Sequence, residues 1–164
     1  MELKQLAGYL PYGLKGICTE EFTGIETVYG ISYYKDSSDI YLITSFDDLD
    51  IEYFKPILRP LSDLTKEINY GLSTYAFTYL FEIGDCDGCV FEFEHGNIKT
   101  IKALENISKY NSYNDINYLP NAVVNMMYEH HFDVFGLIEQ GLAIDINTLN
   151  KWHVQKSNKI SWIN

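Results

Sequence analysis

The chain has 164 residues, of which 46% are hydrophobic and 15% aromatic, and its 23 acidic and 12 basic side chains give a formal net charge of −11. This length predicts one soluble globular domain, and the aromatic content argues against intrinsic disorder. Direct nucleic-acid binding is not expected, because it needs clustered lysines and arginines and Arg59 is the only arginine.

The N-terminal sequence MELKQLAG lacks the basic and apolar regions of a secretory signal, and no apolar run approaches the ~18 residues of a membrane span. The only cysteines are Cys18, Cys86 and Cys89, and so small and odd a number cannot form a closed disulfide framework. We therefore expect a protein of a reducing cytoplasm that makes no membrane contact.

The first predicted elements are two strands, at residues 27–34 and 40–45, where β-branched and aromatic residues dominate. The polar residues 35–39 between them have the composition of a hairpin loop. We therefore predict a β-hairpin.

Acidic residues and prolines follow this hairpin. Pro56 and Pro60 are predicted to bracket a loop around Arg59, because proline lacks a donor and biases its predecessor toward extended geometry. Ser62 is a suitable N-cap for a short helix over residues 63–68. The acidic run is expected to cap a turn or begin a short helix, and comprises Asp47, Asp48, Asp50 and Glu52.

A second hairpin is predicted within residues 75–95, where large apolar residues alternate with smaller or polar ones. A two-residue turn would place apolar side chains opposite glutamates, so we expect a three-residue loop at 86–88. The resulting register pairs Ile83 with Phe91 and Phe81 with Phe93.

The later part of the chain has helical periodicity. Residues 119–121 are expected to open a helix that runs to about His131. Asp133 can cap another short helix, which Gly141 would end in the left-handed conformation, and residues 143–146 can return as a short strand.

These elements predict the α+β class, with a mostly antiparallel sheet built from N-terminal and central hairpins and with helices concentrated in the C-terminal part. We expect a single globular domain over residues 1–164. It would be strand-rich over about 1–98 and helix-rich over about 99–150, and would end in a basic tail at 151–164.

Cys86 and Cys89 form a lone Cys-x-x-Cys pair, which supplies only half of a structural zinc site. Coincidental loop cysteines explain the pair best. Zinc binding is an alternative, with His95 as a weak candidate ligand, and redox catalysis is a third, although neighbouring acids would raise the thiol pKa. No cofactor is expected. The other candidate ligands are Cys18, His130 and His131.

The predicted register of the second hairpin places Glu82 opposite Glu92, with Glu94 diagonal to both. An exposed sheet face is the simplest explanation of these like charges. Whether the acidic residues form one continuous surface is left open by the sequence. The candidates are Asp47, Asp48, Asp50, Glu52, Glu82, Glu92 and Glu94.

Glu129, His130 and His131 end the predicted long helix, where a protonated histidine would interact favourably with the helix dipole. Adjacent residues do not share a helix face, so the two histidines are not expected to chelate a metal together. A capping or packing role is expected for them.

Three segments resemble small uncharacterised proteins encoded by phages and prophages of gut Bacteroidetes. The resemblance implies a phage or mobile-element product acting inside the bacterium, and it implies no activity, cofactor or site residue. The segments are LAGYLPYGLK at 6–15, KPILRPLSDLTKEI at 55–68 and HHFDVFGLIEQGLAIDINTL at 130–149.

We expect a non-enzymatic accessory protein that binds an unidentified host or phage protein through an aromatic-rich surface. One alternative is an acidic inhibitor that mimics nucleic-acid charge and blocks a host defence protein. A weaker alternative is a metal-dependent enzyme that uses Cys86, Cys89 and a histidine. The sequence leaves the oligomeric state open.

Overall fold

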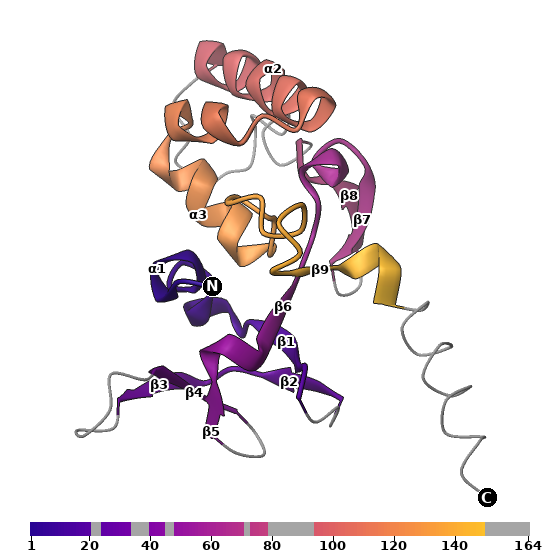
Figure 1. Ribbon diagram of the computed structural model, residues 1–164. Helices are drawn as coiled ribbons and strands as arrows, with labels where there is room; N and C mark the ends of the chain where they lie inside the picture. Colours follow the sequence, from indigo (N-terminus) through magenta and orange to yellow (C-terminus); the bar gives the residue numbers. More distant parts are fainter. Residues whose placement is uncertain (21–23, 34–39, 45–47, 71–72, 79–93, 150–164) are drawn as a thin grey trace, which may run out of the picture. The chain divides into compact units, whose positions relative to one another are not determined.

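The computed structural model describes residues 1–20, 24–33, 40–44, 48–70, 73–78 and 94–149 (Figure 1). They form two compact units, the first made of Met1–Arg59 with the described residues from Met127 onward, and the second of Pro60–Met126. Antiparallel strand pairs lie in the N-terminal and central parts and helices in the C-terminal part, which confirms the predicted α+β class. The single domain stays a prediction.

The first unit contains a four-stranded sheet with the order β2-β1-β6-β9. β1 pairs antiparallel with both β2 and β6, whereas β9 pairs parallel to β6. Ile17, Ile57 and Ile144, one from each of three strands, form a buried cluster on this sheet. The strands are β1 (Lys15–Cys18), β2 (Ile25–Thr27), β6 (Phe54–Leu58) and β9 (Ile144–Asp145).

Two short helical elements precede this sheet in the chain: α1 (Leu3–Leu6) and a 3-10 turn at Leu10–Tyr12. Tyr9 lies between them and is fully buried. Its hydroxyl donates a hydrogen bond to the carbonyl oxygen of Phe132 (2.7 Å) and accepts one from the backbone N–H of Val134 (3.2 Å). Burial raises the Tyr9 pKa well above its usual value, so the hydroxyl keeps the proton that it donates.

A three-stranded antiparallel sheet in the same unit comprises β3 (Gly30–Tyr33), β4 (Ile40–Ile43) and β5 (Asp48–Asp50). The pairing of β3 with β4 confirms the first predicted hairpin in its described part. β5 pairs with β4 and leads into a 3-10 turn at Ile51–Tyr53.

The predicted loop between Pro56 and Pro60 is wrong, because β6 runs through Pro56. Thr19 N–H donates to Tyr53 C=O, so the alternation of an antiparallel ladder makes Ile17–Lys55 the next hydrogen-bonded pair. Gly16 and Pro56 then form a non-hydrogen-bonded pair, in which the proline nitrogen points away from β1. The absence of an N–H group on Pro56 therefore removes no hydrogen bond between β1 and β6.

The second unit begins with a 3-10 turn at Leu61–Asp63, followed by the hairpin of β7 (Glu67–Tyr70) and β8 (Ser73–Ala76). The predicted helix over residues 63–68 is therefore wrong. A helix of six residues would leave most of its N–H and C=O groups without intrahelical partners. Pairing of β7 with β8 instead gives the backbone of these residues hydrogen-bond partners across the hairpin.

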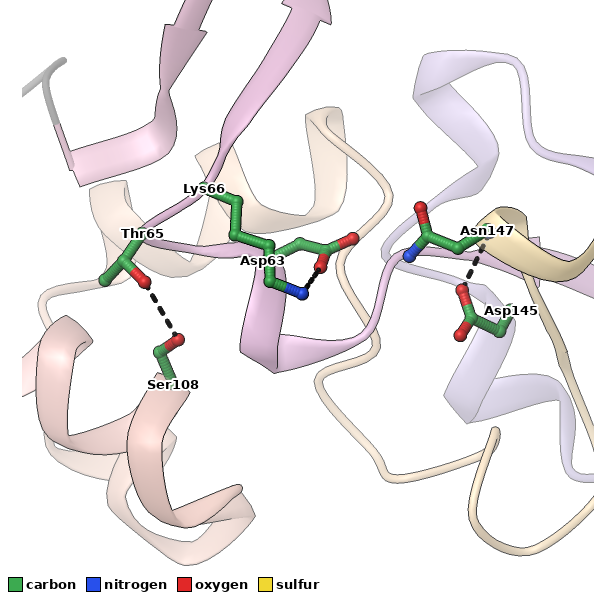
Figure 2. A network of polar contacts seen from close by, with 6 residues as sticks. All are labelled: Asp63, Thr65, Lys66, Ser108, Asp145 and Asn147. Carbon is green, nitrogen blue, oxygen red and sulfur yellow. Dashed lines mark hydrogen bonds and ion pairs between the residues drawn. The ribbon is translucent and has the colours of Figure 1, made fainter.

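Helices complete the second unit: α2 (Glu94–Tyr110), a 3-10 helix at Tyr113–Tyr118, and α3 (Asn121–Glu129), which crosses the boundary into the first unit. α2 packs against the turn at Leu61–Asp63. Figure 2 shows the hydroxyls of Thr65 and Ser108 in hydrogen-bond contact (3.4 Å), and Lys66 paired with Asp63 (2.7 Å).

The second predicted hairpin falls mostly outside the described residues, including all of 79–93. Where the structure describes it, β8 pairs with β7, and Glu94 begins α2 rather than continuing a strand to His95. The predicted position of Glu94 diagonal to other glutamates on a sheet is therefore wrong. The buried residues Leu104, Ile107 and Ser108 follow helical spacing and account for α2.

The C-terminal predictions are largely confirmed. α3 and β9 form close to their expected positions, and Gly141 adopts a left-handed φ of 71°. Asp133 does cap backbone N–H groups, but residues 134–140 form turns rather than a helix. Gly136, at a φ of 69°, interrupts any right-handed helix there.

Candidate functional site

The predicted site residues that the structure describes belong to both units, and the others lie outside the described residues. Asp48, Asp50 and Glu52 lie in the first unit, whereas Glu94 begins α2 in the second. His95 is also in α2. Within the described part of the chain, no group of three or more His, Cys, Asp or Glu residues could hold a metal ion. The candidates outside the described residues are Asp47, Glu82, Cys86, Cys89 and Glu92.

Asp48 and Asp50 project from the same face of the three-stranded sheet. They are paired with Ile43 and Tyr41, whereas Leu49 between them is paired with the fully buried Leu42 on the opposite face. The two aspartates therefore face away from the core. Ser32 Oγ donates to Asp48 Oδ2 (3.4 Å), which ties β3 to β5 on this outer face.

Tyr53 brings further carboxylates to this region. The charges of Glu20, Glu52 and Asp50 raise the pKa of its exposed phenol, with Glu20 acting most strongly and also hydrogen bonding to it. The pairing of β1 with β6 positions Glu20, because the backbone N–H and the side chain of Thr19 both bond to the Tyr53 carbonyl (2.8 and 3.0 Å).

We call Glu20, Asp48, Asp50, Glu52 and Tyr53 the acidic face. Ile43, which is 39% exposed and is paired with Asp48, adds apolar area beside it. Concentrated negative charge with accessible aromatic and aliphatic surface suits contact with lysine- or arginine-bearing segments. No local sequence pattern indicates Glu20 as part of this face, because only strand pairing brings it to Tyr53.

A second cluster of functional side chains surrounds Arg59, at the end of β6. The Arg59 N–H donates to His131 C=O and the Asp133 N–H donates to Arg59 C=O, both at 2.8 Å. Arg59 and Phe132 thereby form a parallel bridge. His131 has a left-handed backbone with a φ of 57°, and its ring stacks on Tyr9 with centroids 6.4 Å apart.

Both histidines of this cluster are neutral at pH 7. Burial and the charge of Arg59 lower the pKa of His130 to about 4, and burial, Arg59 and Lys15 lower that of His131. The predicted favourable interaction of a protonated histidine with the helix dipole is therefore wrong, because desolvation and nearby cations outweigh it. We call Lys15, Arg59, His130 and His131 the cationic cluster.

The free energy of unfolding is expected to fall by roughly 1–2 kcal/mol as the pH drops from 6.5 toward 4, after allowance for partial solvent screening. Both histidines have a lower pKa in the folded state than in the unfolded chain. The unfolded chain therefore binds more protons in this window, and stability present above pH 6.5 is lost on acidification.

Urea denaturation of the wild type and of His130→Gln, at about pH 7 and about pH 4.5, isolates this contribution from the carboxylates that titrate in both proteins. The variant should lose less stability on acidification than the wild type does. Equal losses in the two proteins would contradict the assignment to His130.

The second unit has a hollow of about 240 Å³, lined by residues of α2 and of the following 3-10 helix. Ligand pockets usually have volumes of roughly 300–1,000 Å³, so this hollow is too small to carry a site by itself. Among the described residues, no helix is long and apolar enough to cross a membrane. The hollow is lined by Ala103, Asn106, Asp115, Tyr118 and Leu119.

The geometry thus offers two candidate surfaces in the first unit, the acidic face and the cationic cluster. Strand pairing brings the distant Glu20 to the acidic face and joins the separate segments of the cationic cluster. Comparisons with protein-family models, with curated proteins and with solved structures found no match to the chain.

Proposed function

We propose that this is a non-enzymatic accessory protein of phage or prophage origin, which acts in the bacterial cytoplasm by binding a partner protein through the acidic face. The observation that carries the proposal is the convergence of Glu20, Asp50 and Glu52 on the exposed ring of Tyr53. The partner surface would carry lysines or arginines and would come from the host or the phage.

Two physical arguments favour a protein partner. The net charge of −11 and the carboxylates of the acidic face repel the phosphates of nucleic acids, so direct nucleic-acid binding is disfavoured. Tyr53 and Ile43, exposed by 37% and 39%, supply contact area that a purely ionic surface lacks. Charge complementarity would then steer association and select the partner.

Quantitative affinity capture from the bacterial host tests this proposal with three proteins. Asp48→Lys combined with Glu52→Lys is expected to reduce capture of the specific partner by about tenfold, because it reverses two charges of the acidic face. The matched control combines Glu67→Lys with Glu105→Lys, which makes the same charge change at exposed residues of the second unit.

The partner should be retained by this control variant. Equal loss of the partner from both double variants would show that net charge alone drives capture. Absence of any specifically enriched protein would remove the interaction proposal.

The mimic of nucleic-acid charge is the second candidate, and the shared outer face of Asp48 and Asp50 favours it. A mimic would occupy the nucleic-acid site of its target, so added duplex DNA should displace the captured partner. A partner that stays bound in the presence of saturating DNA would contradict mimicry while leaving the interaction proposal in place.

A further inference from the structure

The acidic face combines negative charge with apolar contact area on the outer side of the three-stranded sheet. Asp48 and Asp50 lie on this side of β5, and the exposed Ile43 is paired with Asp48. The end of the Ile43 side chain extends toward Gly30 of β3, where a Cβ would lie 3.4 Å from it. A segment that carries lysines and large apolar side chains would complement this surface.

The rest of the acidic face lies where β1 ends and β6 begins. The backbone N–H and Oγ of Thr19 both donate to the Tyr53 carbonyl oxygen (2.8 and 3.0 Å), which places the next residue, Glu20, beside Tyr53. Asp50 Oδ1 accepts from the Glu52 N–H (2.9 Å), so the turn that carries Tyr53 is attached to the end of β5. These bonds to the backbone hold the carboxylates and the exposed Tyr53 ring in one region.

The chain itself contains a segment with the complementary chemistry. The basic tail, residues 151–164, has three lysines and no aspartate or glutamate, although the whole chain has a net charge of −11. It also holds both tryptophans of the sequence, which supply apolar area for contact. These residues lie outside the described part of the chain. The lysines are Lys151, Lys156 and Lys159, and the tryptophans are Trp152 and Trp162.

The basic tail begins within reach of the acidic face. Leu149, the last described residue, packs against the isoleucine cluster of the four-stranded sheet, which includes Ile17. Ile17 precedes Glu20 by three residues, so their Cα atoms are at most about 11 Å apart. Lys156 and Lys159 follow Leu149 by seven and ten residues, which can span roughly 24 and 34 Å. Both lysines therefore have enough chain to reach the carboxylates.

We propose that the basic tail folds back onto the acidic face of its own chain, with Lys156 and Lys159 against the carboxylates, and that a partner must displace it to bind there. Because the tail and the face belong to one chain, the effective concentration of the tail is on the order of millimolar, and weak contacts suffice for docking. Docking requires no partner, whereas the competition rests on the proposed function.

Tryptophan fluorescence of the full chain reports docking without a label, because both tryptophans lie in the basic tail. Acrylamide is an uncharged quencher, so salt and charge reversal do not alter its own attraction to the protein. Raising NaCl from about 0.05 M to about 1 M should increase quenching of the wild type about twofold, because salt screens contacts between exposed charges.

The face variant, Asp48→Lys combined with Glu52→Lys, should show this increased quenching already at low salt. The matched control, Glu67→Lys combined with Glu105→Lys, makes the same charge change at exposed residues of the second unit. This control should be quenched as the wild type is. Equal increases in the face variant and the control would show that net charge alone sets the quenching, and would overturn docking on the acidic face.

The tail variant, Lys156→Gln combined with Lys159→Gln, keeps the test valid if the face variant fails to fold, because it changes no residue of the described fold. It should also raise acrylamide quenching at low salt about twofold. Its control, Lys102→Gln combined with Lys109→Gln at exposed positions of α2, should not. Quenching that is unchanged in both the face variant and the tail variant would overturn the proposal.

Carbodiimide cross-linking identifies the copy of the chain on which the tail docks, because it joins a lysine directly to a carboxylate in contact with it. Linked peptides that contain Lys156 or Lys159 together with Glu20 or Glu52 should occur in protein of monomer mass. The same links confined to protein of dimer mass would assign the acidic face to a second copy, and would overturn docking within one chain.

The affinity capture described for the proposed function separates docking from competition. The tail variant should recover severalfold more partner than the wild type, because its tail would no longer cover the acidic face. Docking without this increase would overturn the competition. Quenching and cross-linking that show no docking, together with a partner still captured through the acidic face, would overturn the tail proposal and leave the proposed function in place.

Discussion

Replacing Asp133 with alanine is expected to lower the free energy of unfolding by about 3 kcal/mol. The Asp133 carboxylate is fully buried and accepts hydrogen bonds from the backbone N–H groups of Leu137 and Ile138, both at 2.8 Å. These two hydrogen bonds cap the turns that connect the Arg59 bridge to β9. Alanine would leave both N–H donors without this partner. Urea denaturation followed by circular dichroism measures the loss.

The pKa of Asp133 is raised by burial, although backbone donors oppose the shift. This pKa lies above the unfolded value, so the stability linked to Asp133 protonation is present below pH 3.8 and is lost as the pH rises through the raised pKa. At neutral pH the hydrogen bonds therefore offset the desolvation of a buried charge. Alanine removes this charge along with the hydrogen bonds, so the fall in the free energy of unfolding is smaller than the loss of the bonds alone would cause.

Two variants serve as comparisons for Asp133→Ala. Asp133→Asn keeps one acceptor oxygen and should show an intermediate loss. Asp145→Ala removes a partly exposed carboxylate that caps the last 3-10 turn by accepting from Asn147 N–H (2.8 Å; Figure 2), and should cost only ~1 kcal/mol. Equal losses for Asp133→Ala and Asp145→Ala would mean that the buried carboxylate does not organise this segment.

The sequence predicts those elements of this fold whose signals are local. The first hairpin has two segments rich in β-branched and aromatic residues on either side of a polar stretch, and α3 starts directly after Pro120. β6 could not be predicted in the same way, because Pro56 is acceptable only at a position whose nitrogen points away from β1. That position depends on pairing with Gly16, which lies forty residues earlier in the chain.

The two candidate surfaces also differ in whether neighbouring residues or distant segments form them. Asp48 and Asp50 share a face because they are two residues apart on one strand, which the sequence pattern can indicate. The cationic cluster instead depends on contacts between distant segments. Tyr9, Arg59 and Phe132, from three segments far apart in the sequence, meet there through the hydroxyl bond of Tyr9 and the bridge between Arg59 and Phe132.

A substitution at the centre of the four-stranded sheet should reveal how tightly β1 and β6 approach each other. Gly16→Ala is expected to lower the free energy of unfolding by about 3 kcal/mol. A methyl group at Gly16 would overlap the Phe54 ring and would lie 2.6 Å from the backbone oxygen of Lys55. The ring is only 2% exposed, and the oxygen belongs to a paired strand, so neither can move away freely.

Gly30→Ala is the matched control, because Gly30 also lies in a strand and the nearest atom to its added methyl would be the end of the Ile43 side chain at 3.4 Å. This control should change stability by less than about 0.5 kcal/mol. Combining Gly16→Ala with Phe54→Leu should recover part of the loss, since it removes ring atoms from the overlap. If Gly16→Ala were as mild as Gly30→Ala, the close approach of β1 and β6 would not limit the side chain at position 16.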